Sequence, residues 1–244
     1  MPRSLDDKPI KPAKPAKPAK PGKAAAPISK SAGRPRAADV ETRMQELLST
    51  AACLFLQKGY SGVSLEMIAR EAHVAVRTIY VKFGGKAGLL NAIIAGGRLR
   101  HFSSMEDMQT DQRPLNQILS DFGLRFLELV STPAAIELHR MVIAEARTNP
   151  ELATTFHLAG PLQTRDMLTR FCARPEIAAQ FRSDIAPAML PSHLISCIMG
   201  DQATRFLFVQ EQGQEQAQEA TREDMLRQVA QGLDLFLRAT LRSA

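Results

Sequence analysis

The 244-residue chain contains no tryptophan, two tyrosines, three cysteines and no long apolar run. So few large aromatic rings argue against binding of single-stranded nucleic acid, because that binding depends on bases stacked on aromatic side chains. The cysteines, Cys53, Cys172 and Cys197, lack the C-x-x-C spacing, so we expect neither a disulfide framework nor a zinc site. This cysteine usage indicates a reducing compartment. No stretch approaches the roughly 20 apolar residues of a membrane span, and the Pro- and Lys-rich N-terminus is not a secretory signal.

Motifs of enzyme active sites are also missing. The chain has no G-x-S-x-G sequence, no P-loop and no dinucleotide-binding fingerprint. Five histidines show neither H-E-x-x-H nor any other paired-ligand spacing: His73, His101, His139, His157 and His193. We therefore expect a protein that is not an enzyme and that needs no metal or cofactor.

Charge is distributed very unevenly along the chain, whose formal net charge is +6. Residues 1–36 hold ten basic and two acidic residues, residues 37–100 hold eight and five, and residues 101–244 hold 13 and 18. The three regions therefore carry net charges of +8, +3 and −5. A basic arm on a more acidic body indicates binding to nucleic acid through the arm and residues 37–100, and argues against contact with DNA over residues 101–244.

Residues 1–36 form a Lys-, Pro- and Ala-rich tail that we predict to be disordered. From Lys8 to Lys23 a lysine recurs every third residue, and each lysine up to Lys20 is followed by proline. Such a sequence favours extended polyproline II, which aligns the ammonium groups for contact with phosphates. Arg34 and Arg36, next to Gly33 and Pro35, predict a minor-groove arm. The alternative for the tail is a solubilising segment with no specific role.

Short amphipathic segments follow the tail. Apolar spacing predicts one helix over residues 40–57, which Gly59 would end, and Ser64 would cap a second. A tight turn separates that helix from a short segment over residues 75–83, and a fourth helix starts near Lys86. Helix, turn and short helix are the helix-turn-helix arrangement, although a three-helix bundle with a polar surface gives the same pattern.

Residues 59–90 hold a spaced pattern of glycine, aromatic, small and apolar residues. Its members are Gly59, Tyr60, Val63, Ser64, Ile68, Ala69, Ala72, Val74, Thr78, Ile79, Tyr80, Phe83, Lys86, Leu89 and Leu90. This pattern resembles the signature of the TetR/AcrR family. The resemblance implies an all-α, homodimeric bacterial transcriptional regulator, usually a repressor. It further implies a cytoplasmic protein that associates with the nucleoid by binding double-stranded DNA.

By this resemblance the chain has two domains after the tail. Residues 37–86 would form a three-helix helix-turn-helix head, and residues 87–244 a larger helical domain for effector binding and dimerisation. The expected DNA-contacting residues of the head are Ser64, Arg77, Thr78, Tyr80, Lys82 and Lys86. Arg77 and Thr78 are the candidates for base contact, and Tyr80, Lys82 and Lys86 for phosphate contact. Tyr80 could instead pack between helices, and Arg77 could be an ordinary solvated residue.

Three residues depart from the family pattern. His73 stands where a glycine is usual, so we expect a positive φ there, which histidine adopts more readily than most residues. Ala75 stands where a serine often caps the short helix, so one cap is missing. Gly85 replaces the usual serine before Lys86, and glycine is an acceptable N-cap.

The C-terminal region is predicted to be a series of helices. Apolar spacing places them over residues 114–130, 133–148, 150–158, 187–210 and 222–241. Gly160-Pro161 either kinks the third helix or separates it from another that runs to Cys172, and residues 211–220 are expected to be a loop. The last two helices resemble the four-helix dimer interface of the family, and residues 138–152 resemble its AefR-like branch.

The effector, an unknown small molecule, is not identified by the sequence. Phe126, Met141 and Phe156 could line its cavity, since such cavities are mostly apolar, but plain core packing explains each equally well. Two other functions stay open. One is a nonspecific DNA-binding protein that uses the Lys-Pro tail. The other is a helical carrier or enzyme that has lost DNA binding.

Overall fold

The computed structural model describes residues 37–103, 108–208 and 222–242. The regular elements of these residues are helices. One isolated β-bridge pairs Phe181 with Leu241. In chain order they are α1 (Ala37–Lys58), α2 (Leu65–Glu71), α3 (Val76–Phe83), α4 (Lys86–Phe102), α5 (Leu115–Val130), α6 (Pro133–Glu145), α7 (Pro150–Ala159), α8 (Pro161–Cys172), α9 (Pro175–Ala178), the 3-10 turn η2 (Pro187–Met189), α10 (Leu190–Met199), α11 (Gln202–Phe208) and α12 (Arg222–Thr240). The predicted all-α fold is confirmed. The predictions for the tail and for residues 211–220 concern residues outside the described part of the chain.

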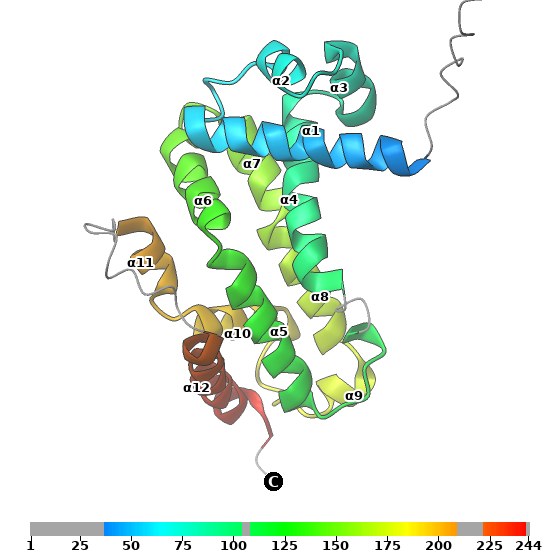
Figure 1. Cartoon of the computed structure of the whole chain (residues 1–244). Helices are drawn as coiled ribbons and strands as arrows, with labels where there is room; N and C mark the ends of the chain where they lie inside the picture. The colour runs from blue at the N-terminus through cyan, green and yellow to red at the C-terminus, as the bar shows by residue number, and fades with distance from the viewer. Residues whose placement is uncertain (1–36, 104–107, 209–221, 243–244) are drawn as a thin grey trace, which may run out of the picture.

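Helices α1, α2 and α3 gather at one end of the molecule, and α4 runs from them toward the other end (Figure 1). Local chemistry sets their limits as expected. Gly59, with φ 75°, ends α1 in a left-handed conformation that glycine adopts without strain. The Ser64 hydroxyl accepts a hydrogen bond from the Met67 amide at 3.2 Å and caps α2.

Two separate clusters of buried apolar side chains hold the helices together. The first, which we call the head core, joins α1–α3 and the N-terminal half of α4 with α6 and α7. It contains Leu47, Ala51, Leu54, Phe55, Tyr60, Val63, Leu65, Ile68, Ala69, Ile79, Leu89, Leu90, Ile94, Val142, Leu152 and Ala159. The apolar contacts of the head therefore continue past residue 86 into α4 and reach α6 and α7.

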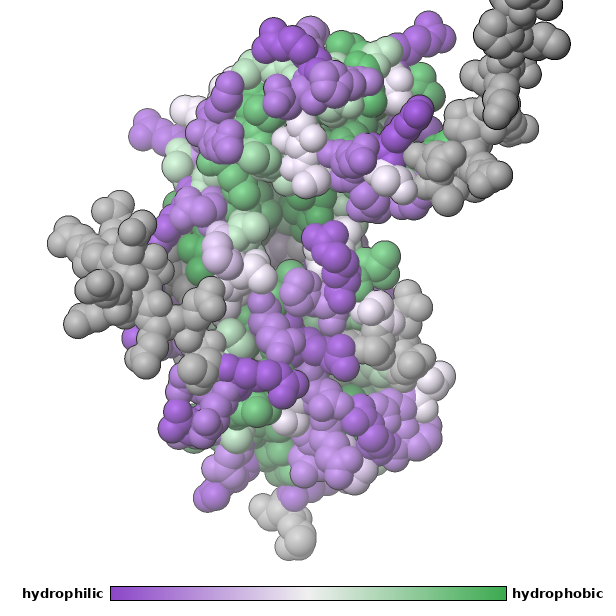
Figure 2. All heavy atoms as spheres, in the orientation of Figure 1, coloured by the Kyte–Doolittle hydropathy of each residue, from purple (hydrophilic) through white to green (hydrophobic). Residues whose placement is uncertain are grey.

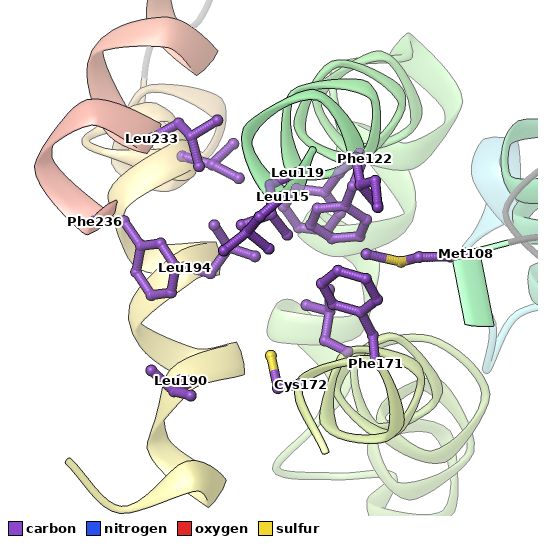
Figure 3. Packing of buried hydrophobic residues seen from close by; sticks show 14 of the residues in the cluster. Met108, Leu115, Leu119, Phe122, Phe171, Cys172, Leu190, Leu194, Leu233 and Phe236 are labelled. Atoms are coloured by element: carbon purple, nitrogen blue, oxygen red, sulfur yellow. The ribbon is translucent and has the colours of Figure 1, made fainter. Parts of the chain in front are cut away.

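The second cluster, the body core, lies between α5, α8, α10 and α12. Figure 3 shows Phe122, Phe171, Leu194 and Phe236 from these four helices directed toward one another. Helix α12 packs against both α10 and α5, and its predicted apolar stripe forms this contact. Hydrophilic residues cover most of the surface around α5 and α9 on the face shown in Figure 2.

One predicted helix is wrong. The apolar stretch over residues 187–210 is not a single helix, because Gly200, with φ 52°, interrupts it. The stretch divides into η2, α10 and α11. The alternative left open at Gly160-Pro161 is also settled, since α7 ends at Ala159 and α8 begins at Pro161. None of the described helices is both long and apolar enough to cross a lipid bilayer.

Candidate nucleic-acid interface

The turn between α2 and α3 has the predicted positive φ. His73 has φ 53°, and within the described residues it is the non-glycine residue with a positive φ. Ala75 begins α3 in an extended conformation, and its side chain makes no cap hydrogen bond, as expected. Below the turn, Ile68 and Ile79 are fully buried in the head core. Buried contacts on one side and a tight turn on the other fix the angle between α2 and α3.

Helix α3 has a buried side and an exposed side. Ile79 is inaccessible to solvent, whereas Arg77, Tyr80 and Lys82 are exposed and Thr78 is half-buried. Tyr80 is 56% exposed, so its ring does not pack between helices, which was the alternative. Residues three and four apart lie on one face of a helix, so Arg77 and Tyr80 are neighbours and Thr78 and Lys82 are neighbours.

Ser64 and Lys86 have partners within the protein. The Ser64 hydroxyl caps α2 and is also hydrogen-bonded to the Glu66 carboxylate. The pKa of Glu66 lies below its usual value because of a hydrogen bond to its own backbone and, second, the bond to Ser64. The Lys86 ammonium lies 4.2 Å from the centre of the Tyr60 ring and 5.9 Å from that of Phe55. Burial lowers the pKa of Lys86, against the charges of Glu145 and Glu151. The half-buried ammonium therefore contacts aromatic rings of the head core.

The N-terminus of α4 lies beside α3. Gly85 is its N-cap with φ 130°, a conformation that favours glycine, and no side chain caps the helix there. Uncapped amides at a helix N-terminus favour anions. The sequence prediction that glycine is acceptable at this N-cap is confirmed. Arg34 and Arg36, predicted for the minor groove, lie outside the described residues.

Glu145, at the C-terminal end of α6, contacts the loop between α1 and α2. Its Oε1 accepts a hydrogen bond from the Tyr60 amide at 2.8 Å, and its Oε2 accepts from the Ser61 amide at 2.9 Å and from the Ser61 hydroxyl at 2.5 Å. Burial opposes ionisation of Glu145, but these bonds and the Lys86 charge outweigh it and hold its pKa below the usual value. We call this contact the Glu145 clamp.

The sequence predictions missed Glu145. One signal was present, because a carboxylate at a helix C-terminus opposes the helix dipole and so suggests a partner elsewhere. The close approach of the loop is visible at Gly59, where an added Cβ would lie 2.8 Å from Glu145 Oε1. The ring of Tyr60 is buried beside the clamp, and burial, with the charges of Glu151 and Glu145, raises its pKa to about 12.

The three effector-binding candidates do not lie in one cluster. Phe126 belongs to the body core, where its ring stacks on Phe122 with the centres 5.6 Å apart. Met141 and Phe156 pack against the head core instead, and Phe156 meets the His139 ring edge-on at 4.8 Å. A pocket of about 540 Å³ lies at the end of the molecule away from α3, where Arg113 is among the lining residues, and none of the three candidates lines it.

Comparison with known proteins agrees with this geometry. Residues 47–93 match the family model "Bacterial regulatory proteins, tetR family", and residues 117–239 match "AefR-like transcriptional repressor, C-terminal domain". The second match alone spans half of the chain. The chain belongs to the TetR family. It is therefore a DNA-binding transcriptional regulator with a helix-turn-helix head and an AefR-like C-terminal domain.

Individual TetR-family relatives are distant. The chain is 23% identical to the HTH-type transcriptional repressor ComR of Escherichia coli K12 over 180 residues, which are 70% of this chain and 81% of ComR. A TetR transcriptional regulator from Agrobacterium tumefaciens superimposes with a TM-score of 0.61 at 19% identity, covering 82% of this chain and 95% of that one. The SmeT–triclosan complex gives a TM-score of 0.60 at 22% identity, covering 83% and 93%. At these identities the solved structures show the fold that the TetR-family chain shares with them.

Proposed function

We propose that this protein is a homodimeric repressor that binds a palindromic operator and is released from it by a small-molecule effector. The observation that carries the proposal is the exposed face of α3, where Arg77 and Tyr80 project from a helix fixed by buried Ile79. A short helix held in this way can enter the major groove, and two copies related by a twofold axis require a palindrome.

Each site residue has a proposed role in this complex. Arg77 and Thr78 contact base edges, and Tyr80 and Lys82 contact phosphates. Lys86 reaches a phosphate from the N-terminus of α4, which requires its ammonium to leave the Tyr60 ring. Ser64 contributes at the start of α2 while it caps that helix, and Arg34 and Arg36 follow the minor groove.

The proposed domains are the tail (1–36), the head (37–86) and the regulatory domain (87–244). We place the protein in the bacterial cytoplasm, on the nucleoid. SmeT, which shares this fold, forms a complex with triclosan, and this supports a small-molecule effector here. Phe126, Met141 and Phe156 remain the candidate effector contacts. An effector can shift the protein between two states only by binding one of them more tightly.

The Glu145 clamp offers a route between the two domains. It joins the C-terminal end of α6 to the loop that precedes α2, through three hydrogen bonds. A movement of α6 on effector binding would therefore pull on the loop from which α2 and α3 follow. The apolar contacts that α6 and α7 make within the head core would pass the same movement to α1–α3.

A gel-shift assay with the DNA upstream of the protein's own gene tests the proposed function. We expect the wild-type protein to shift this duplex in preference to a scrambled one, and the double variant Arg77→Ala, Tyr80→Ala to lose the preference. Arg170→Ala, an exposed arginine in the last turn of α8, is the control and should bind as the wild type does. Equal binding to the scrambled duplex, or no loss in the double variant, would contradict the proposal.

A further inference from the structure

A large apolar side chain is exposed on α3 where charged and polar residues would be expected. Val81 is 71% exposed, the largest fraction among the exposed large apolar residues of the described part of the chain. Tyr80, the residue before it, is also 56% exposed, so both of these large side chains of α3 reach solvent. Single exposed apolar residues are common on protein surfaces, so the meaning of Val81 depends on its position.

Packing does not account for Val81. The contacts that hold α3 come from Ile79, which is fully buried, and from the partly buried Val76 and Phe83. Valine is also a poorer helix former than lysine, arginine or alanine, because its branched side chain loses freedom in a helix. At an exposed helix position it therefore gains nothing from the core and costs some local stability.

The position of Val81 puts it on the face that would enter DNA. It lies four residues after Arg77 and next to Tyr80, and residues four apart are neighbours on one face of a helix. Four residues advance a helix by about 6 Å. Successive base pairs of B-DNA are about 3.4 Å apart. Along the groove, Val81 would therefore face a base pair one or two steps from the pair that Arg77 contacts.

The chemistry of the major groove supplies one apolar partner for such a side chain. Guanine, cytosine and adenine present hydrogen-bonding groups there, whereas thymine adds a C5-methyl group. Phosphates offer valine nothing, since it carries neither charge nor donor. We propose that Val81 is a specificity-determining residue that contacts the C5-methyl of thymine. Together with Arg77, which pairs best with guanine, it selects half-sites with a thymine one or two base pairs from a G·C pair.

This inference rests on the proposed function, and it is tested with duplexes that contain deoxyuridine. The full-length wild-type protein is first used to select its preferred duplex from a random library. Each thymine of that duplex is then replaced by deoxyuridine, which removes the methyl group and keeps base pairing. We expect a loss of affinity of roughly fourfold at one position in each half-site, the value for one buried methyl-sized group.

The variant Val81→Ala completes a double-mutant cycle. We expect it to bind the unmodified duplex about fourfold more weakly than the wild type, with no further loss when deoxyuridine stands at the sensitive position. Because Val81 is exposed, the variant should keep the fold, which circular dichroism checks. Leu99→Ala, which truncates a 60% exposed residue of α4, is the matched control and should keep the full deoxyuridine effect.

Two outcomes would overturn the inference, and they are distinguishable. If a preferred duplex is recovered but Val81→Ala binds it as tightly as the wild type, or keeps the whole loss on deoxyuridine, Val81 does not contact the methyl group. The proposed function then stands. If no duplex is enriched over the random library, the proposed function fails as well.

Discussion

At the scale of single residues, two side chains act through local helix-end chemistry and a third through a contact with a distant part of the chain. Ser64 provides a cap that the helix start needs, Ala75 leaves the next helix without one, and Glu145 binds a loop 84 residues away in sequence. The first two follow from the chemistry of helix ends, which is local to the chain. The third depends on where α6 ends in space.

The uncapped start of α3 predicts that Ala75→Ser stabilises the protein. Ala75 already has the extended conformation of an N-cap, with ψ 141°, so a serine hydroxyl there can accept from a free amide. We expect the free energy of unfolding to rise by about 1 kcal/mol, measured by urea denaturation. Ala173→Ser, at the exposed C-terminal end of α8, is the control and should bring no such gain. A loss of stability in Ala75→Ser would show that no amide is available.

The Glu145 clamp predicts a pH-dependent loss in Glu145→Gln. The folded pKa of this carboxyl lies below its ordinary value of 4.5, so the clamp stabilises the protein above that value. This contribution is lost as pH falls through the lowered folded pKa. We expect Glu145→Gln to lower the free energy of unfolding at pH 7 by about 1 kcal/mol, and the difference from the wild type to shrink toward pH 3.

A second glutamate of α6 is the control for this effect. Glu137 pairs with Arg140 at the surface, and exposed pairs of this kind contribute little. Glu137→Gln should therefore change stability by well under half as much at pH 7. A Glu145→Gln effect of the same size at pH 7 and pH 3 would mean that the ionised carboxylate is not what binds the loop.

At the scale of elements, glycines decide how closely helices approach. Helices α10 and α12 pack against each other at Gly232, where an added Cβ would lie 2.3 Å from the carbonyl oxygen of Cys197. That obstacle is backbone, so it cannot move aside as a side-chain end would. In contrast, a Cβ at Gly96 in α4 would meet only the end of the Arg100 side chain, at 3.7 Å.

The two glycines therefore predict opposite effects of the same substitution. Gly232→Ala forces α10 and α12 apart, and we expect it to lower the free energy of unfolding by about 1 to 3 kcal/mol. Gly96→Ala should raise it by up to about 1 kcal/mol, because alanine is the better helix former. Thermal and urea unfolding of both variants measure this. Equal effects would contradict the close approach at Gly232.

Elements also show where apolar patterns mislead. The stretch over 187–210 is hydrophobic enough to suggest a long helix, yet Gly200 has a positive φ and divides it. Apolar spacing is a property of many residues together, and one glycine changes it little. The chain changes direction at this glycine, since α10 packs against α12 and α8 whereas α11 packs against α6.

At the scale of the whole molecule, net charge changes from positive to negative along the chain, and the head core and the body core follow one another along α4. The +8 tail and the +3 region over residues 37–100 precede a −5 remainder. Helix α4 links the two cores, since Leu90 belongs to the head core and Phe102 to the body core. A change within the body can thus reach the head through α4 as well as through the Glu145 clamp.

Deletion of residues 1–30 separates the role of the tail from that of the head. Seven lysines and one arginine are removed, so we expect weaker binding to every duplex and a shallower dependence of log affinity on log salt concentration. The preference for the selected duplex should remain, because Arg77 and its neighbours on α3 are intact. Loss of all binding would favour the alternative of a nonspecific DNA-binding protein that acts through its tail.

The sequence by itself determined the helical fold, the turn at His73, the cap at Ser64 and the family, because these depend on residues near one another in the chain. Tertiary structure alone decided the Glu145 clamp, the contact of Lys86 with the Tyr60 ring and the separation of Phe126 from Met141 and Phe156. Such features depend on how closely helices from distant parts of the chain approach one another. That distance follows from packing of the whole set of side chains, which spacing along the sequence does not encode.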